Sequence, residues 1–292
     1  MNQHTEFVIY PFCYIIVLIT ISIAYSYCNV NYYCIAHGLE RDYNMADYSK
    51  DAGQSIQTPN ERDVIRVAVD IALFTIREGK FQILLIKRGI PPFLGFWALP
   101  GGLIRTDLGE LGEDPESAAI RELREETGLS VAPGYIEQLR TYGNPDRDPR
   151  NRVISIAHMG IGPTLENPTG GSDAVHAGFV PVEDITEDYK LAFDHKTIIA
   201  DAVDRARSKL EYSTLATEFC PPEFTITELR NVYETIWGTS LDPGNFQKKV
   251  LGCEGYLAEI GKTSPTSSTG GRPAKLYKAG PAKVINLPIR SS

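Results

Sequence analysis

Hydrophobic residues recur with two different periods along the chain, and these periods predict where strands and helices lie. Runs rich in β-branched and aromatic residues are typical of strands, above all where apolar and polar positions alternate. Five such runs occupy residues 64–76, 81–89, 134–143, 152–162 and 177–185. The "REGK" turn after the first run predicts that the first two strands form a hairpin.

Two stretches with helical spacing accompany these strands. Asp114 is a good N-cap, Pro115 fits the first helical position and Gly128 fits the position just past the end, so we expect a helix from residue 115 to about 127. Residues 194–212 predict a second, amphipathic helix. Its buried side is expected to consist of Ile198, Ile199, Ala202, Val203 and Leu210.

The pattern changes after residue 212, where a second domain is expected to begin. Thr225 and Glu228 match a capping box at the start of a helix. Helices are expected over residues 225–238 and 241–252, and two short strands around a Gly/Ser/Thr-rich loop within residues 255–278. Helix, turn, helix and a two-stranded wing outline a winged helix-turn-helix.

Composition agrees with two globular domains. The chain has 292 residues, of which 42% are apolar and 23% charged, enough to build real cores. The net charge is −8, yet residues 213–292 carry nine Lys/Arg against seven Asp/Glu. An acidic front with a more basic tail indicates two modules that handle partners of different charge. Five cysteines without a pairing pattern predict free thiols in a reducing compartment.

The N-terminal region allows two interpretations. Residues 7–28 form a run of 22 residues without a charge, long enough to span a bilayer. The flanks of this run lack the Lys or Arg of a signal peptide or of a positive-inside anchor. We favour a mis-set start, with Met45 as the true first residue, and expect a cytoplasmic protein; a membrane segment is the alternative.

The stretch "RELREETGL", residues 121–129, concentrates acidic residues on one helix face. Glu122, Glu125 and Glu126 fall within about 100° of one another, and like charges at this spacing repel. A hard divalent cation, Mg²⁺ or Mn²⁺, would remove the repulsion, neutralise a phosphate and activate a water. Arg121 and Glu113 can pair and tie the preceding loop to the helix. A solvated helix face is the plainer interpretation of these few residues alone.

A longer pattern decides between these interpretations. Glu113, seven further residues and then "RELREETGL" match the Nudix box, G-x5-E-x7-R-E-U-x-E-E-x-G-U with U aliphatic, so this stretch resembles Nudix hydrolases. One departure is that ten residues, instead of five, separate Gly102 from Glu113. The resemblance implies an α/β fold, a Nudix α/β/α sandwich, that hydrolyses nucleoside diphosphate derivatives with Mg²⁺. It makes Glu122, Glu125 and Glu126 the metal ligands, one of them the base, with Arg121 and Glu113 as a supporting catalytic pair.

Both modules together resemble the NrtR family, the Nudix-related transcriptional regulators of NAD metabolism. The resemblance rests on "YIEQLRTYGNPDRDPRNRVIS", "LAFDHKTIIADAV", "FTITELRNVYETIWGTSLDPGNFQKKVL" and "GGRPAKLYK". It implies ADP-ribose as the ligand and double-stranded DNA as a partner of a homodimer. The nucleotide site is expected to include Gly101, Gly102, Arg147, Arg150 and Arg152, although a salt-bridged surface loop explains the arginines equally well.

The second predicted helix of the winged module would enter a major groove. The polar side chains available to bases and phosphates are Asn245, Gln247, Lys248 and Lys249 on the helix, with Arg272 and Lys275 in the wing. The alternative is that these are ordinary solvated residues. We therefore divide the chain into an extension (1–60), a Nudix domain (61–212) and a DNA-binding domain (213–292).

Three functions are weighed against one another. The first is an ADP-ribose-responsive transcriptional regulator that binds DNA and hydrolyses its ligand with Mg²⁺. The second is a plain ADP-ribose pyrophosphatase whose C-terminal domain serves dimer contacts. A purely structural module is the third, and it leaves the complete Nudix pattern unexplained.

Overall fold

The structure is a computed structural model, and it describes residues 64–108, 111–129, 133–163, 165–171, 174–265 and 273–285. The predicted apolar segment at residues 7–28, the proposed start at Met45, three of the cysteines and Arg272 lie outside these residues. Within the described part, no helix is both long and apolar enough to cross a bilayer. Cys220 is a buried free thiol, as the sequence predicts.

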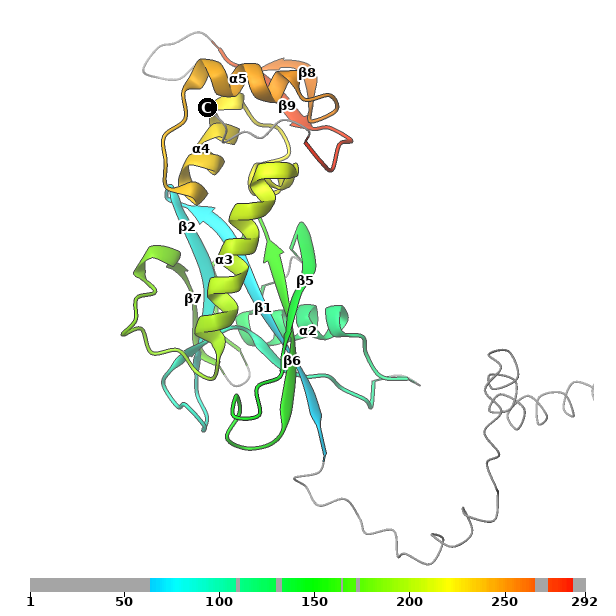
Figure 1. Ribbon diagram of the computed structural model, residues 1–292, viewed down its shortest axis with the longest axis vertical. Coiled ribbons are helices and arrows are strands. Elements are labelled where there is room, and N and C mark those ends of the chain that lie inside the picture. The colour runs from blue at the N-terminus through cyan, green and yellow to red at the C-terminus, as the bar shows by residue number, and fades with distance from the viewer. Residues whose placement is uncertain are drawn as a thin grey trace, which may run out of the picture. The chain divides into compact units, whose positions relative to one another are not determined.

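A mixed seven-stranded sheet forms the centre of the first module (Figure 1). Its strands are β1 (Arg66–Arg77), β2 (Lys80–Arg88), β3 (Trp97–Ala98), β4 (Gly101–Leu103), β5 (Tyr135–Tyr142), β6 (Val153–Ile161) and β7 (Ala174–Pro181). The order β3-β2-β1-β6-β5 runs through the sheet, while β4 pairs with β1 and β7 with β2. Strand β1 is parallel to β6 and antiparallel to β2 and β4.

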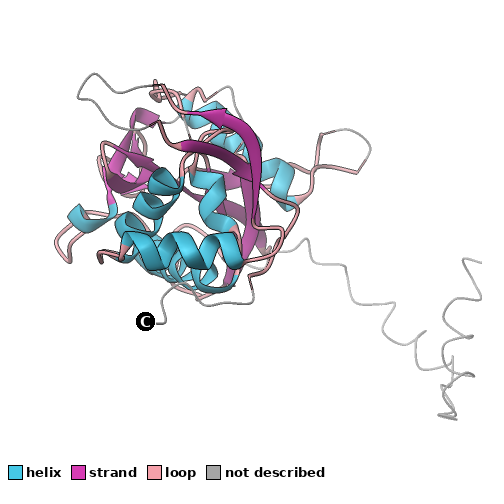
Figure 2. Cartoon of the chain, turned by 90° about the horizontal axis from the view of Figure 1, so that it is seen from above, coloured by secondary structure: helices cyan, strands magenta, loops and turns pink. Residues whose placement is uncertain are grey.

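Two helices cover opposite faces of this sheet, and the alternation along β1 shows how. Val69, Ile71 and Leu73 pack with α2 (Pro115–Thr127) in one apolar cluster. Ala72 and Phe74 belong to a second cluster with α3 (His195–Tyr212). Because successive strand residues point to opposite faces, one strand contributes to both cores. The predicted α/β/α sandwich is therefore confirmed, and Figure 2 shows the helices around the sheet.

Local sequence signals fix the ends of α2 as predicted. The carboxylate of Asp114 accepts hydrogen bonds from the backbone N–H groups of Glu116 and Ser117. Pro115 occupies the first turn, and Gly128 ends the helix with φ +68°, a left-handed conformation that glycine adopts without steric cost. The helix start is therefore held close to the loop that carries Glu113.

The second module consists of α4 (Ile226–Trp237), α5 (Pro243–Gly252) and the hairpin of β8 (Leu257–Thr263) and β9 (Lys275–Ala279). Thr225 and Glu228 form both bonds of the predicted capping box. Asp242 caps α5 through the Asn245 N–H. Short 3-10 turns at Val182–Asp184 (η3) and Leu215–Phe219 (η4) complete the described elements. The helix-turn-helix with a two-stranded wing is confirmed.

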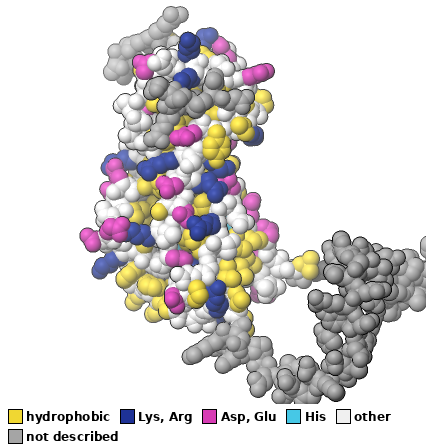
Figure 3. Space-filling model, viewed as in Figure 1, with side chains coloured by type: hydrophobic (Ala, Val, Ile, Leu, Met, Phe, Trp, Pro, Cys, Tyr) yellow, Lys and Arg dark blue, Asp and Glu magenta, His cyan; other side chains and the backbone are white. Residues whose placement is uncertain are grey.

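The apolar core is continuous between the two modules. One cluster contains residues of α3, η4, α4 and α5 together with the sheet. Phe81 of β2 contacts the ring of Phe219 edge-on, with ring centroids 6.1 Å apart. On the outside, basic and acidic side chains are interspersed over the face that Figure 3 shows.

Candidate nucleotide site

A cavity of about 500 Å³ lies between α2, β4 and the loop after β5. Glu122, Glu125 and Glu126 give it an acidic wall. Its basic residues are Arg66, Arg88, Arg105 and Arg150. A smaller cavity of about 80 Å³ shares Arg88, Gly101, Gly102 and Arg150 with it and reaches Phe193 and His195. Negative and positive groups that face one cavity fit a ligand bearing both a cation and phosphates.

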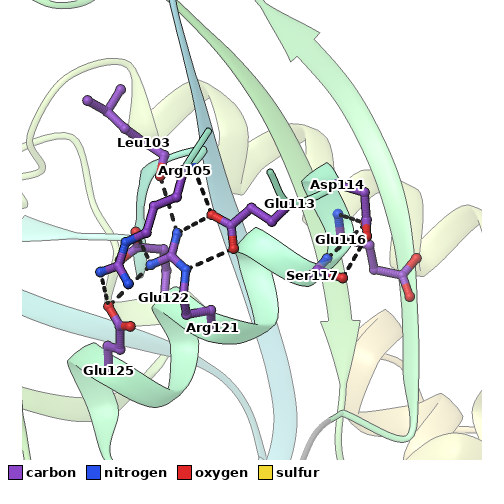
Figure 4. A network of polar contacts seen from close by, with 9 residues as sticks. All are labelled: Leu103, Arg105, Glu113, Asp114, Glu116, Ser117, Arg121, Glu122 and Glu125. Carbon is purple, nitrogen blue, oxygen red and sulfur yellow. Dashed lines mark hydrogen bonds and ion pairs between the residues drawn. The ribbon is translucent and has the colours of Figure 1, made fainter. Parts of the chain in front are cut away.

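Arg121 and Glu113 form the pair expected from the sequence. Arg121 donates from Nε and Nη2 to the two carboxylate oxygens of Glu113, at 2.9 and 2.5 Å (Figure 4). Its Nη1 also lies 2.7 Å from Oε1 of Glu122 and 3.2 Å from Oε2 of Glu125. The hydrogen bond from Arg121 lowers the pKa of Glu113, against the effect of partial burial. This arginine therefore links the loop to two of the acidic residues.

Glu126 lies deepest of the three glutamates. The carboxylate accepts a 2.9 Å hydrogen bond from the Gly101 N–H, and the residue is only 6% exposed. Burial raises the pKa of Glu126 to about 8 and also raises the pKa of Glu122. Both effects have the cause expected for carboxylates removed from water without a full counter-charge.

The two glycines of the "PGG" loop are required by close approach. A Cβ on Gly102 would lie 2.3 Å from Oε1 of Glu122, and one on Gly101 would lie 2.3 Å from the Val69 carbonyl oxygen. Any side chain at these positions would displace the acidic wall or strand β1. Their place in the lining of both cavities agrees with the predicted nucleotide site.

The chemistry of the acidic wall fits a divalent cation. In the part of the chain that the structure describes, no three acidic, histidine or cysteine side chains converge on one point. Arginine side chains occupy some of the carboxylate oxygens: Arg105, like Arg121, donates to Glu125, at 3.0 Å. Even so, all three glutamates line one cavity, and two of them are carboxylates deprived of solvent. Carboxylate oxygens are the donors that Mg²⁺ and Mn²⁺ prefer.

The arginines of residues 144–152 do not share one role. Arg150 lines both cavities and bonds Asp148 through two nitrogens, and its side chain is 49% exposed. Arg152 lines neither cavity, and its Nη1 donates to the Val153 carbonyl oxygen. Arg147 borders only the smaller cavity, and its side chain is 4% exposed. Only Arg150 is therefore placed as the sequence analysis expects of a ligand contact.

Arg147 belongs to a buried cluster that sequence reasoning missed. Its guanidinium lies 3.2 Å from Asp70 and 2.7 Å from Asp194. Asp70 also accepts from Ser155 and faces Nε2 of His195 at 3.3 Å. Burial would raise the pKa of Asp70, but the attraction of His195 and Arg147 with the hydrogen bonds holds it at about 2. These residues come from β1, β6, α3 and two loops, so no local pattern marks them.

The predicted DNA-contacting residues lie partly where expected. Asn245, Gln247 and Lys248 of α5 are exposed, while Lys249 is half-buried. Lys275 of β9 forms a 2.8 Å ion pair with Glu259 of β8, across the wing. The exposed face of α5 is therefore the part of the module that is open to a polyanion.

Comparisons with known proteins agree with both modules. The Nudix domain family matches residues 64–202, and the NrtR DNA-binding winged helix domain matches residues 216–279. The chain is a Nudix hydrolase domain followed by a DNA-binding winged helix.

Relatives that match about three quarters of the chain identify the family. The ADPR responsive transcriptional repressor NtrR of Acinetobacter baylyi is 34% identical over 212 residues, which are 73% of this chain and 81% of the relative. The crystal structure of Shewanella oneidensis NrtR with a 27mer DNA has 31% identity and a TM-score of 0.61, and the match covers 74% of this chain and 94% of that one. The chain belongs to the NrtR family.

A further relative matches less than half of the chain. An ADP-ribose pyrophosphatase of Methanocaldococcus jannaschii is 44% identical over 133 residues, which are 45% of this chain and 71% of the relative.

Proposed function

We propose that this protein is an ADP-ribose-responsive transcriptional regulator that also hydrolyses ADP-ribose. The observation that carries the proposal is the cavity in which Glu122, Glu125 and Glu126 face Arg66, Arg88 and Arg150. A pyrophosphate needs cations on one side and tolerates carboxylates only across a metal ion. The relatives named above respond to or act on ADP-ribose, and this cavity has the charges that such a ligand requires.

All predicted pocket residues except Arg152, which lines neither cavity, have a place in this proposal. Glu122, Glu125 and Glu126 would hold the cation, Mg²⁺ or Mn²⁺, which when bound supplies positive charge to the phosphates and lowers the pKa of a water. Arg121 and Glu113 hold the loop against α2. Gly101 and Gly102 let the ligand approach the backbone, and Arg150 contacts a phosphate. We assign Arg147 to the support of the pocket, because its guanidinium is already bound by two carboxylates.

Hydrolysis follows from the same arrangement. A water oxygen attacks one phosphorus, the bond from that phosphorus to the bridging oxygen breaks, and AMP and ribose 5-phosphate leave. Glu126 takes the proton of the water. Its carboxylate lines the cavity beside Glu122 and Glu125, where the water held by the ion would lie.

The winged helix supplies the output. Asn245, Gln247 and Lys248 of α5 would reach base edges and phosphates, with Lys249, Lys275 and Arg272 adding positive charge. A homodimer would double these contacts. A regulator that uses ADP-ribose and DNA works in the cytoplasm, and control of NAD metabolism fits the ligand.

DNA binding with and without ADP-ribose tests the regulator. A fluorescein-labelled duplex that the chain enriches from random sequences is titrated at several salt concentrations. We expect a salt-dependent complex whose affinity changes with ADP-ribose. Lys248→Ala should lower the slope of log affinity against log salt by about 1, the loss of one phosphate contact, while Lys196→Ala on α3 should not change it. Absence of any complex at low salt would reject the regulator.

The alternative function is a plain ADP-ribose pyrophosphatase that does not bind DNA. The observation in its favour is the intact acidic wall of Glu122, Glu125 and Glu126. This alternative predicts Mg²⁺-dependent release of AMP from ADP-ribose and no DNA complex. Release of AMP together with DNA binding supports the combined function.

A further inference from the structure

Helix α3 reaches the nucleotide pocket at its beginning. Phe193 and His195 both line the smaller cavity, beside Arg88, Gly101 and Arg150. His195 is the first residue of α3. A ligand that enters this cavity therefore meets the start of a helix which continues for 18 residues.

The first contact is a polar one. Nδ1 of His195 accepts a 2.8 Å hydrogen bond from the Leu99 N–H, and Nε2 faces Asp70 at 3.3 Å. Leu99 lies two residues before Gly101, whose N–H bonds Glu126. The loop that shapes the acidic wall and the first turn of α3 are thus joined through one imidazole ring.

The second contact is aromatic. Phe193 has φ +53°, an uncommon conformation for a residue other than glycine. Its ring packs at 4.9 Å from Phe93 and lies under the guanidinium groups of Arg88 and Arg150, at 4.9 and 5.6 Å. Both arginines line the ligand cavity. A phosphate bound there competes for the same guanidinium groups that hold the Phe193 ring, so occupancy changes the support of the helix start.

The last turns of α3 contact the winged helix. Nε of Arg207 donates to the Ile236 carbonyl oxygen, and Nε1 of Trp237 donates to the Arg207 carbonyl oxygen, both at 3.1 Å. Ile236 and Trp237 are the final residues of α4. The side chain of Glu234 in turn accepts from the Leu241 N–H, which ties α4 to the turn before α5. The contacts of α3 therefore reach the end of α4, and Glu234 extends them to the turn before α5.

Strand β2 also spans this distance, but it is less free to move. Arg88 lies at the pocket, and Phe81 contacts Phe219 near the second module. Strand β2 is hydrogen-bonded to β1, β3 and β7, so a displacement would break ladder bonds on both edges. Helix α3 packs on the sheet through side chains, and packed helices shift against neighbours by small shear movements.

We infer that α3 transmits occupancy of the nucleotide pocket to the winged helix, through His195 and Phe193 at one end and the reciprocal Arg207–Trp237 contact at the other. This inference rests on the proposed function, because it names the path by which ADP-ribose alters DNA binding. The coupling is an energetic link between two sites, and it can be cut at the far end without touching the pocket.

The test uses the full chain with Arg207→Met, Trp237→Phe and both together. Arg207→Met keeps the length of the side chain and removes the donor to Ile236. Trp237→Phe keeps an aromatic ring against Tyr233 and removes the donor to Arg207. The matched control is Arg205→Met on the same helix, because the Arg205 guanidinium donates to β5 instead, at Glu137 and the Leu139 carbonyl oxygen.

Two titrations and one structural readout are made on each variant. Calorimetry gives the affinity for ADP-ribose, and anisotropy gives the affinity for the enriched duplex with and without ADP-ribose. Coupled sites commonly change one another's affinity by about 5- to 150-fold. We expect the wild type and Arg205→Met to show such a change. The double variant should retain its ADP-ribose affinity within about twofold while the change in DNA affinity falls to about twofold or less.

Hydrogen exchange keeps the inference testable if a variant binds DNA poorly. In the wild type, ADP-ribose should alter the exchange of α4 amides; in the double variant the alteration should end within α3. A double variant that responds to ADP-ribose as the wild type does, in DNA affinity and in exchange, overturns the inference and leaves the proposed function intact. A wild type that binds DNA without any response overturns the proposed function, and this inference with it.

Discussion

Two charged clusters border the nucleotide pocket, and they differ in how far their side chains are exposed to solvent. The cluster on α2 joins Glu113, Arg121, Glu122 and Glu125 with Arg105. Its outer pair, Arg105 and Glu125, keeps 44% and 36% of the side chains exposed, while Arg121, Glu113 and Glu122 keep 15% or less. The cluster around Asp70 is buried: the side chain of Arg147 is 4% exposed and that of Asp70 is 9% exposed. An exposed ion pair exchanges its partner for water or for a metal ion at little cost, while a buried charge that loses its partner is left uncompensated. The α2 cluster is therefore suited to binding a metal ion and to catalysis, and the cluster around Asp70 is suited to holding the pocket in shape.

The largest effect is expected from the residue that belongs to the acidic wall and is itself buried. Glu126→Gln keeps an acceptor for the Gly101 N–H and removes the base. Release of AMP from ADP-ribose should fall by about 10²- to 10⁴-fold, measured by chromatography under Mg²⁺. Glu116→Gln, an exposed position on the first turn of the same helix, is the control and should retain activity. Full turnover by Glu126→Gln would remove Glu126 from the mechanism.

Substitutions in the buried cluster around Asp70 should lower the stability of the fold. Arg147→Met leaves Asp70 and Asp194 without their shared counter-charge, so the free energy of unfolding in urea should fall by about 3–5 kcal/mol. Arg140→Met breaks the exposed pair with Asp201 and should cost less than about 1 kcal/mol. Equal losses in the two variants would contradict the distinction between the clusters.

The pH dependence of stability sharpens the same point. Asp70 has a pKa of about 2, below the ordinary value of 3.8, so between these values the unfolded chain binds more protons than the folded one. The stability from this carboxylate is present above about pH 4 and lost as pH falls through about 2. The difference in unfolding free energy between wild type and Asp70→Asn should therefore shrink from pH 5 to pH 2.5. A difference that is constant over this range would show that the ionised form of Asp70 is not what the cluster stabilises.

The smallest effect is expected at the exposed edge of the α2 cluster. Arg105→Met removes the pair with Glu125, and unfolding free energy should change by no more than about 1 kcal/mol. Because the guanidinium no longer occupies the Glu125 carboxylate, the affinity for Mn²⁺ should stay the same or rise, which calorimetry measures. A lower affinity would indicate that Arg105 supports the ion site and does not compete with it.

The same contrast explains what could be predicted from the sequence. The α2 cluster is local: Asp114, Pro115 and Gly128 set the ends of the helix, and the spacing of its glutamates places them on one face. The capping box of the winged helix, at Thr225 and Glu228, was equally local and is confirmed.

The buried cluster around Asp70 could not be predicted, because its residues are far apart in the sequence and come together only in the folded chain. His195 lies 125 positions after Asp70, and the contact exists because β1 and the start of α3 meet at the pocket. Arg147 was assigned to the ligand because its loop resembles one that borders the nucleotide site in the NrtR family. Two aspartates, one of them the residue before α3, use its guanidinium instead. Which partner an arginine takes depends on tertiary packing that no spacing reveals.

The account depends on a divalent ion joining the glutamates of α2 to a pyrophosphate, and calorimetry of ADP-ribose with the full chain tests this directly. With Mg²⁺ the wild type should bind ADP-ribose. With EDTA, or in the Glu122→Gln/Glu126→Gln double variant, affinity should fall by at least about tenfold, which corresponds to about 1.4 kcal/mol. Equal affinity in all three experiments, or no binding by the wild type, would contradict the account.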